Sequence, residues 1–181
     1  MPKSGLKGAK AHAARLKKLT GETMIREVGK ALFAAGEMVQ TEAQISITAG
    51  AVSGKNHKPS APGKPPNNES GVLAGNIETV QAAPLVVEVS SNAPYAAIHE
   101  FGGTIKHPGG TPYFMRDGKA VFVGNSGYGA FHTLPKTKPH DIEMPARPYM
   151  GPARDAKRKE VTALVQKAVN RAVKRSKSGD T

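Results

Sequence analysis

The residues best suited to metal chemistry are His99, Glu100 and His107. A zinc-protease helix carries two histidines four residues apart, so that both imidazoles point from one helical face. His99 and His107 are eight residues apart, and the glycines between them would break a helix. We therefore interpret His99 as a partly buried hydrogen-bonding residue and predict no metal site and no cofactor.

The sequence contains no pattern typical of nucleophilic or nucleotide chemistry. It has no cysteine, no Gly-x-Ser-x-Gly nucleophile elbow and no Gly-x-x-x-x-Gly-Lys-Ser/Thr phosphate loop. The glycine pairs at residues 102–103 and 109–110 are instead typical of turns that need positive φ. We predict that the protein is not an enzyme and that it has no catalytic residue.

Residues 95–105 have the sequence YAAIHEFGGTI, in which Tyr95, Ile98 and Phe101 recur at helical spacing. This spacing predicts a short helix whose three large side chains anchor in the core, and Gly102 would end it in a left-handed cap. In this interpretation the Glu100 carboxylate is solvated.

An alternative interpretation pairs Glu100 with Arg147, which lies in the sequence PARPYMGPA at residues 145–153. Pro148 favours an extended backbone at Arg147, and a guanidinium with little backbone freedom suits a bidentate pair with a carboxylate. Glu143 and Asp141 are nearer in sequence, and an acid of a neighbouring subunit is equally possible. Both interpretations give these residues a structural role.

The periodicity of the chain predicts one α+β domain at residues 21–175, between a basic flexible leader at 1–20 and a disordered tail at 176–181. A long N-terminal helix over residues 21–47 would be capped by Thr20. Gly29 and Gly36 lie on its buried face and would let another backbone approach closely.

The rest of the domain is predicted to be an antiparallel sheet of four to five strands, with a C-terminal amphipathic helix packed on it. Residues 77–81 and 85–91 alternate as a hairpin, and Asp117-Gly118 is typical of a primed turn between two further strands. A brief strand follows at residues 141–144. The proline-rich residues 50–71 are predicted to be a long exposed loop that becomes ordered on assembly.

The formal net charge is +12 and the isoelectric point is about 10.0, which favours polyanions or acidic proteins as partners. No apolar run approaches the roughly 20 residues that span a bilayer, so we predict no membrane partner. The positive charges concentrate near the two ends of the chain. The candidate contacts with DNA or an acidic partner are Lys7, Lys10, Arg15, Lys17, Lys18, Lys157, Arg158, Lys159, Arg171, Lys174 and Arg175.

Together, residues 95–105, residues 145–153 and the sequence PPNNESGVL at residues 65–73 resemble one known family. It is the head-to-tail connector and tail-completion (neck, minor tail) proteins of tailed bacteriophages, called virion morphogenesis proteins in Mu-like phages. The family pattern has Thr-Gly more often than Ser70-Gly71, and Glu-Phe-Gly-Thr more often than the longer turn after Glu100. The residues that carry the resemblance, and that it assigns to an interface, are Tyr95, His99, Glu100, Phe101, Gly102, Gly103, Arg147, Pro148 and Tyr149.

The resemblance implies a non-enzymatic protein of the virion neck or tail, assembled in the host cytoplasm. It would form a homo-oligomeric ring, a hexamer, that joins the tail to the connector. Its partners would be connector or portal-side proteins and tail-tube proteins, with non-specific contact to packaged DNA. The alternative is a basic nucleic-acid-binding accessory protein.

Overall fold

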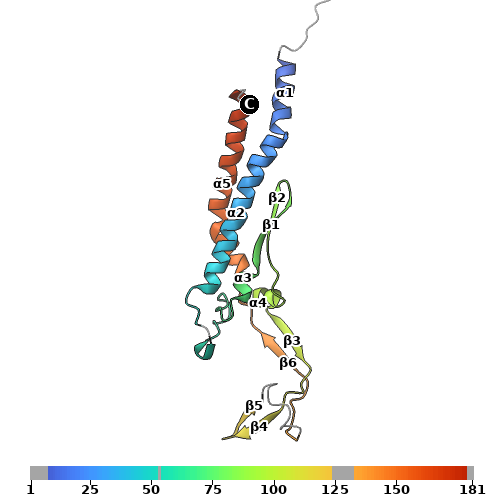
Figure 1. Cartoon of the computed structure of the whole chain (residues 1–181), viewed down its shortest axis with the longest axis vertical. Coiled ribbons are helices and arrows are strands. Elements are labelled where there is room, and N and C mark those ends of the chain that lie inside the picture. The colour runs from blue at the N-terminus through green and yellow to red at the C-terminus, as the bar shows by residue number, and fades with distance from the viewer. Residues whose placement is uncertain (1–7, 53, 124–132, 179–181) are drawn as a thin grey trace, which may run out of the picture.

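The computed structural model describes residues 8–52, 54–123 and 133–178, and it confirms the α+β class (Figure 1). The longer helices are α1 (Ala9–Leu19), α2 (Glu22–Thr48) and α5 (Met150–Ser178). The shorter ones are η1 (Gly54–Asn56), α3 (Val72–Gly75) and α4 (Ala96–Phe101). The predicted long helix is therefore confirmed as α2.

The described strands form three separate antiparallel pairs, which corrects the single sheet expected from the sequence. The pairs are β1 (Ile77–Ala83) with β2 (Val86–Ser91), β3 (Gly103–His107) with β6 (His140–Met144), and β4 (Tyr113–Arg116) with β5 (Lys119–Phe122). Glycines with positive φ redirect the chain before and after β3, so the strand edges do not align. Both predicted hairpins are confirmed, and the turn residues Asp117 and Gly118 have φ of 51° and 74°.

Helix α5 packs along α2, which corrects its expected position on the sheet. Small buried residues, Ala31 and Ala35 on α2 and Ala168 on α5, let the two helices lie side by side (Figure 1). The ion pair Glu42–Lys157, with Oε2 and Nζ 3.4 Å apart, adds to this contact. The sequence shows the amphipathic stripe of α5 but not which element covers it.

The hairpin β1–β2 packs on a different face of α2. A Cβ added to Gly29 would lie 2.7 Å from the carbonyl oxygen of Pro84, and one added to Gly36 would lie 2.6 Å from Cγ2 of Thr79. The two glycines thus allow the close approach that their spacing predicts. The side chain of Gln40 also donates to the carbonyl of Ile77, 2.8 Å away.

The segment interpreted as a leader contains helix α1, so residues 9–19 are corrected from coil to helix. Thr20 does not cap α2. Its hydroxyl donates to the carbonyl of Leu16 at 3.1 Å at the end of α1, and Gly21 is the N-cap residue of α2. At the other end α5 continues to Ser178, beyond the expected start of a disordered tail.

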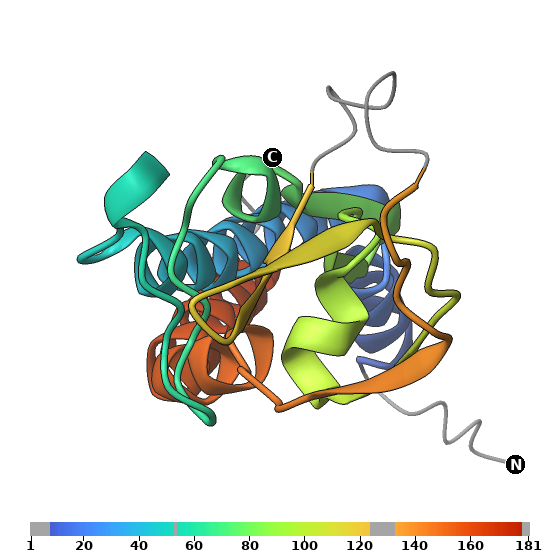
Figure 2. The same cartoon turned by 90° about the horizontal axis from the view of Figure 1, so that it is seen from below.

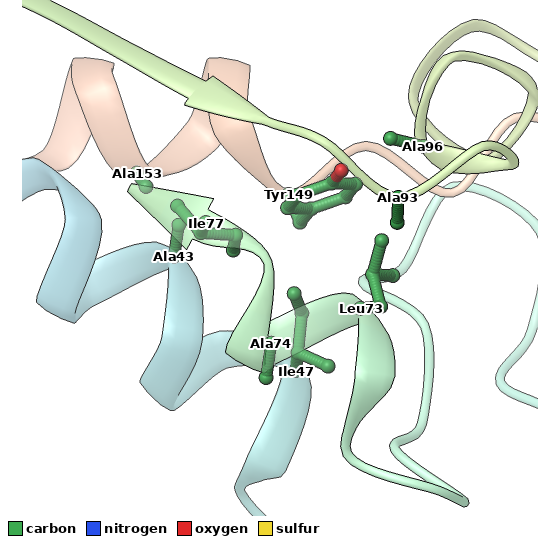
Figure 3. Packing of buried hydrophobic residues seen from close by; sticks show 9 residues of the cluster. All are labelled: Ala43, Ile47, Leu73, Ala74, Ile77, Ala93, Ala96, Tyr149 and Ala153. Carbon is green, nitrogen blue, oxygen red and sulfur yellow. The ribbon is translucent and has the colours of Figure 1, made fainter. Parts of the chain in front are cut away.

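The hydrophobic core lies where α2, α3, β1, α4 and α5 converge (Figure 3). Tyr149, Ile47 and Ile77 are the largest fully buried side chains, and alanines from several elements surround them. Beyond this core the pairs β3–β6 and β4–β5 extend the molecule along its long axis (Figure 1). Figure 2 looks along that axis, with these strands in front of the helices. We call them, at residues 103–123 and 133–144, the β arm.

Candidate assembly site

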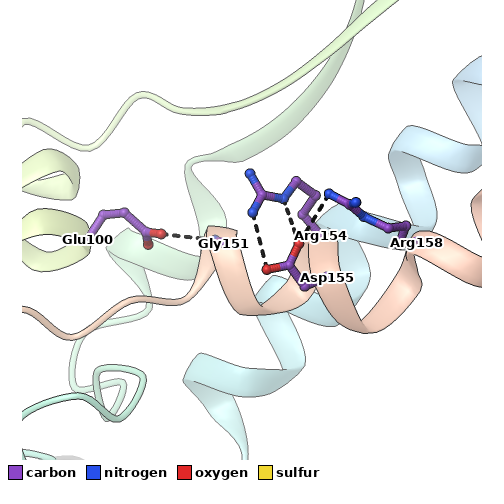
Figure 4. Close-up of polar contacts among 5 residues, drawn as sticks. All are labelled: Glu100, Gly151, Arg154, Asp155 and Arg158. Atoms are coloured by element: carbon purple, nitrogen blue, oxygen red, sulfur yellow. Dashed lines mark hydrogen bonds and ion pairs between the residues drawn. The ribbon is translucent and has the colours of Figure 1, made fainter.

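The carboxylate of Glu100 binds the first amides of helix α5. Its Oε2 accepts hydrogen bonds from the backbone N–H groups of Tyr149 at 2.8 Å and Met150 at 3.0 Å. Its Oε1 accepts from Gly151 at 2.9 Å (Figure 4). A negative charge at this position also complements the positive end of the helix dipole. Glu100 is therefore the N-terminal cap of α5, supplied from a distant part of the chain.

The first turn of α5 has only three backbone N–H groups that need an acceptor outside the helix, so one carboxylate can bind them all. The helical ladder begins with Ala153, whose N–H donates to the carbonyl of Tyr149 at 3.2 Å. The four preceding positions would leave four unpaired amides, but Pro152 has no N–H. Glu100 satisfies the remaining three. The first turn of α5 contains no acidic residue that could do this locally.

Both sequence-based interpretations of Glu100 are wrong within the described chain. The carboxylate is not simply solvated, and it does not pair with Arg147. Nε of Arg147 instead donates to the carbonyl of Ser60 at 3.0 Å, and its backbone N–H donates to the carbonyl of His99 at 2.6 Å. No ion pair of Arg147 occurs among the described residues. A pair with an acid of a neighbouring subunit stays a prediction.

The loop at residues 49–71 is held against its own chain. Besides the bond from Arg147 to Ser60, the N–H of Gly63 donates to the carbonyl of Ala146 at 2.8 Å, and the N–H of Asn68 donates to the carbonyl of Ile47 at 3.0 Å. These bonds use backbone groups, so the low apolar content of the loop does not prevent them. The expectation that the loop becomes ordered on assembly stays a prediction.

Gly102 lies where the two sequence segments described above, residues 95–105 and residues 145–153, meet. Its φ is 71°, and a Cβ at this position would lie 2.8 Å from both the carbonyl oxygen of Met144 and the amide nitrogen of Ala146. The positive φ expected for this glycine is confirmed, although ψ of −173° is extended rather than left-handed helical. From Gly103 onward the contact continues as the β3–β6 ladder, in which Gly103 faces Met144. We call residues 96–102 and 144–151 the α4–α5 joint.

His99 is half-buried in the joint, as the sequence suggested, but its Nδ1 has no hydrogen-bond partner among the described residues. Its ring makes an edge contact with Tyr95, with centroids 5.6 Å apart. Burial lowers the pKa of His99, and the positive charge of Arg147 lowers it further. The joint therefore favours the neutral imidazole.

Tyr149 anchors the joint in the core and is only 1% exposed. Burial raises the pKa of its phenol, and the negative charge of Glu100 acts in the same direction. By contrast, the expected core anchor Phe101 is 79% exposed and Tyr95 is also exposed. Helical spacing identifies one face of α4, but the short helix buries Ala96 instead.

The β arm exposes large apolar side chains. In the β3–β6 pair, Ile105 faces Ile142, and both are more than a third exposed. In the β4–β5 hairpin, Met115 and Phe122 are each 61% exposed. Pro112 alone is buried within the described part of the arm. A two-stranded ribbon is marginally stable in water unless something covers its apolar face.

The candidate DNA contacts divide into paired and free side chains. Lys157 and Arg175 form ion pairs with Glu42 and Glu27 of α2, and Arg158 lies near Asp155 (Figure 4). Arg15 is half-buried. Lys7 lies outside the described residues. The exposed members of the set that form no ion pair with another described residue are Lys10, Lys17, Lys18, Lys159, Arg171 and Lys174.

Within the ranges that the structure describes, no three side chains of His, Asp or Glu gather closely enough to hold a metal ion. None of the described helices combines the length and apolar character needed to cross a bilayer.

The sequence model of the phage virion morphogenesis family matches residues 7–170, a range that includes the joint and the β arm. No curated protein and no solved structure matches the chain.

Proposed function

The chain belongs to the phage virion morphogenesis family, and we propose that it forms a homo-oligomeric ring at the head-to-tail junction of a tailed phage. In this role it completes the tail and joins it to the connector. The coarser statement, a structural protein of a phage virion, follows from the family match itself. We propose that the role is structural and not catalytic.

One observation carries this proposal, namely the position of the exposed apolar arm. The β arm lies at the end of the long axis, beyond the hydrophobic core, where it can reach an adjoining layer of the neck (Figure 1). Met115 and Phe122 are both more than half exposed there. Apolar surface of this kind marks protein interaction sites. We infer that the arm docks on a connector-side or tail-tube protein.

The joint supports the same role, since it fixes the arm to the body. Glu100, at the end of α4, is bound to the start of α5, and the β3–β6 ladder begins three residues later. A rigid connection of this kind would transmit the position of the ring to the docked arm.

The second candidate function is a nucleic-acid-binding accessory protein. The exposed lysines and arginines of α1 and α5 favour it. A ring component would also have basic residues near packaged DNA, and non-specific contact of that kind depends steeply on salt.

The test uses the purified full chain in analytical ultracentrifugation and electron microscopy over a salt series, with and without duplex DNA. We expect closed rings that form at low salt both with and without duplex DNA. A protein that stays monomeric at all concentrations and binds DNA with a steep salt dependence would contradict the proposal and favour the accessory role.

A further inference from the structure

Charge is distributed unevenly on the two flanks of helix α2. Residues 65–105 contain four glutamates and no lysine or arginine, although the whole chain has a net charge of +12. This stretch forms α3, the hairpin β1–β2 and α4. Helix α5, on a different face of α2, contains nine lysines and arginines against two acids. The hairpin flank therefore carries Glu78 and Glu88 with no lysine or arginine, and the other flank is strongly basic.

The outward face of the hairpin carries part of the acidic charge. Thr79 and Val87 point toward Gly36 of α2, so the alternate residues point away from it. These outward residues include Glu78, Val80, Val86 and Glu88, and all four are exposed. No ion pair within the described residues involves either glutamate.

The outward side of α5 carries exposed lysines. Ala168 is buried, and Lys157 is paired with Glu42 of α2, which together identify the inward side. Lys159, Lys167 and Lys174 are exposed, and they lie on the side away from Ala168 at about 100° per residue. No ion pair of these three lysines occurs in the described chain.

We propose that the outward face of the β1–β2 hairpin of one copy docks on the lysine face of α5 of the next copy. This inference rests on the proposed ring and names its subunit contact. Two different faces on opposite flanks make a heterologous contact, and such contacts form a ring when the rotation between successive copies closes. The occupant of each face is then a second copy of this chain.

A second copy suits both faces better than DNA does. DNA would neutralise the lysines but would leave the acidic hairpin uncovered, and it would repel Glu78 and Glu88. The hairpin also exposes Val80 at 46% and Val86 at 49%. The aliphatic stems of lysines can cover such side chains while their ammonium groups reach the glutamates.

The test reverses charge on one face at a time and measures self-association by analytical ultracentrifugation. The hairpin variant is Glu78→Lys/Glu88→Lys and the helix variant is Lys167→Glu/Lys174→Glu. We expect each to weaken association by about tenfold or more, because like charges then face each other. Mixing the two variants, or combining all four changes in one chain, should restore association. Glu69→Lys/Glu143→Lys makes the same charge change at two exposed acids outside the hairpin face and should assemble like the parent.

The possible outcomes distinguish a failure of this contact from a failure of the proposed ring. An assembling parent whose two variants also assemble normally would overturn the proposed contact and leave the ring standing. Lysine variants that lose duplex DNA binding but keep their association would assign the α5 face to DNA and also overturn the contact. A parent that never associates would overturn the ring, and the contact with it. Melting temperatures within a few degrees of the parent would show that each variant is folded.

Discussion

The α4–α5 joint and the β arm are adjacent in the chain but differ in how far they bury their large side chains. In the joint Tyr149 is 1% exposed, and Glu100 satisfies three backbone amides. In the arm Phe122 and Met115 are 61% exposed. The joint thus buries Tyr149, whereas the arm leaves Met115 and Phe122 exposed. We infer that the joint stabilises the folded subunit and that the arm makes contacts with a partner.

The largest expected effect is that of Tyr149→Ala. Removing a fully buried aromatic ring should lower the free energy of unfolding by about 3–5 kcal/mol, since the cavity cannot fully collapse. Urea denaturation of the purified chain measures this. Tyr149→Phe keeps the ring and should cost less than half as much. If Tyr149→Ala were as stable as the parent, Tyr149 would not anchor the joint.

Glu100→Ala should have the next largest effect, about 2–3 kcal/mol, because it leaves three helix amides without their acceptor. Glu100→Gln keeps one amide oxygen and should fall between the alanine variant and the parent. The matched control is Glu143→Gln, an exposed acid that should change stability by less than about 0.5 kcal/mol. Equal stabilities for Glu100→Ala and the control would show that Glu100 does not stabilise the start of α5.

Arg147→Lys should cost about 1 kcal/mol, because lysine has no Nε–H at the position that reaches Ser60. The same change should speed hydrogen exchange at Gly63, whose amide binds the neighbouring Ala146. Exchange that is unchanged across residues 60–64 would show that the arginine does not hold the loop. Arg158→Lys, on the exposed side of α5, serves as the control.

The lowered pKa of His99 predicts a smaller, pH-dependent effect. Below the ordinary histidine pKa of about 6.5, the unfolded chain binds a proton that the folded chain resists, so stability should fall as pH decreases through this value. The loss should level off below the folded-state pKa. His99→Gln should reduce this slope, whereas His12→Gln, on exposed α1, should keep it. Identical slopes in all three proteins would contradict the assignment.

Local patterns predicted the elements well. The periodicity of α2, the alternation of β1 and β2, and the Asp117-Gly118 turn each depend on residues close together in the sequence. The close approach at Gly29 and Gly36 was also predictable, because a glycine on a buried helical face has few other uses.

Long-range pairings were not predictable in the same way. Glu100 caps a helix that begins 50 residues later, and β3 pairs with β6 across the whole β4–β5 hairpin. One local signal does exist, since α5 begins at Met150 with no Ser, Thr, Asp or Asn before it. Such a helix requires a cap from elsewhere, but the sequence does not say which acid provides it.

The most direct test of the division between joint and arm is the variant Met115→Ser/Phe122→Ser. The measurement combines urea denaturation of the purified protein with complementation of a phage that lacks its own copy of the gene. Both side chains are more than half exposed, so the free energy of unfolding should change by less than about 1 kcal/mol, while the titre of infectious particles should fall by about tenfold or more. A destabilised monomer, or a variant that restores the parental titre, would contradict the account.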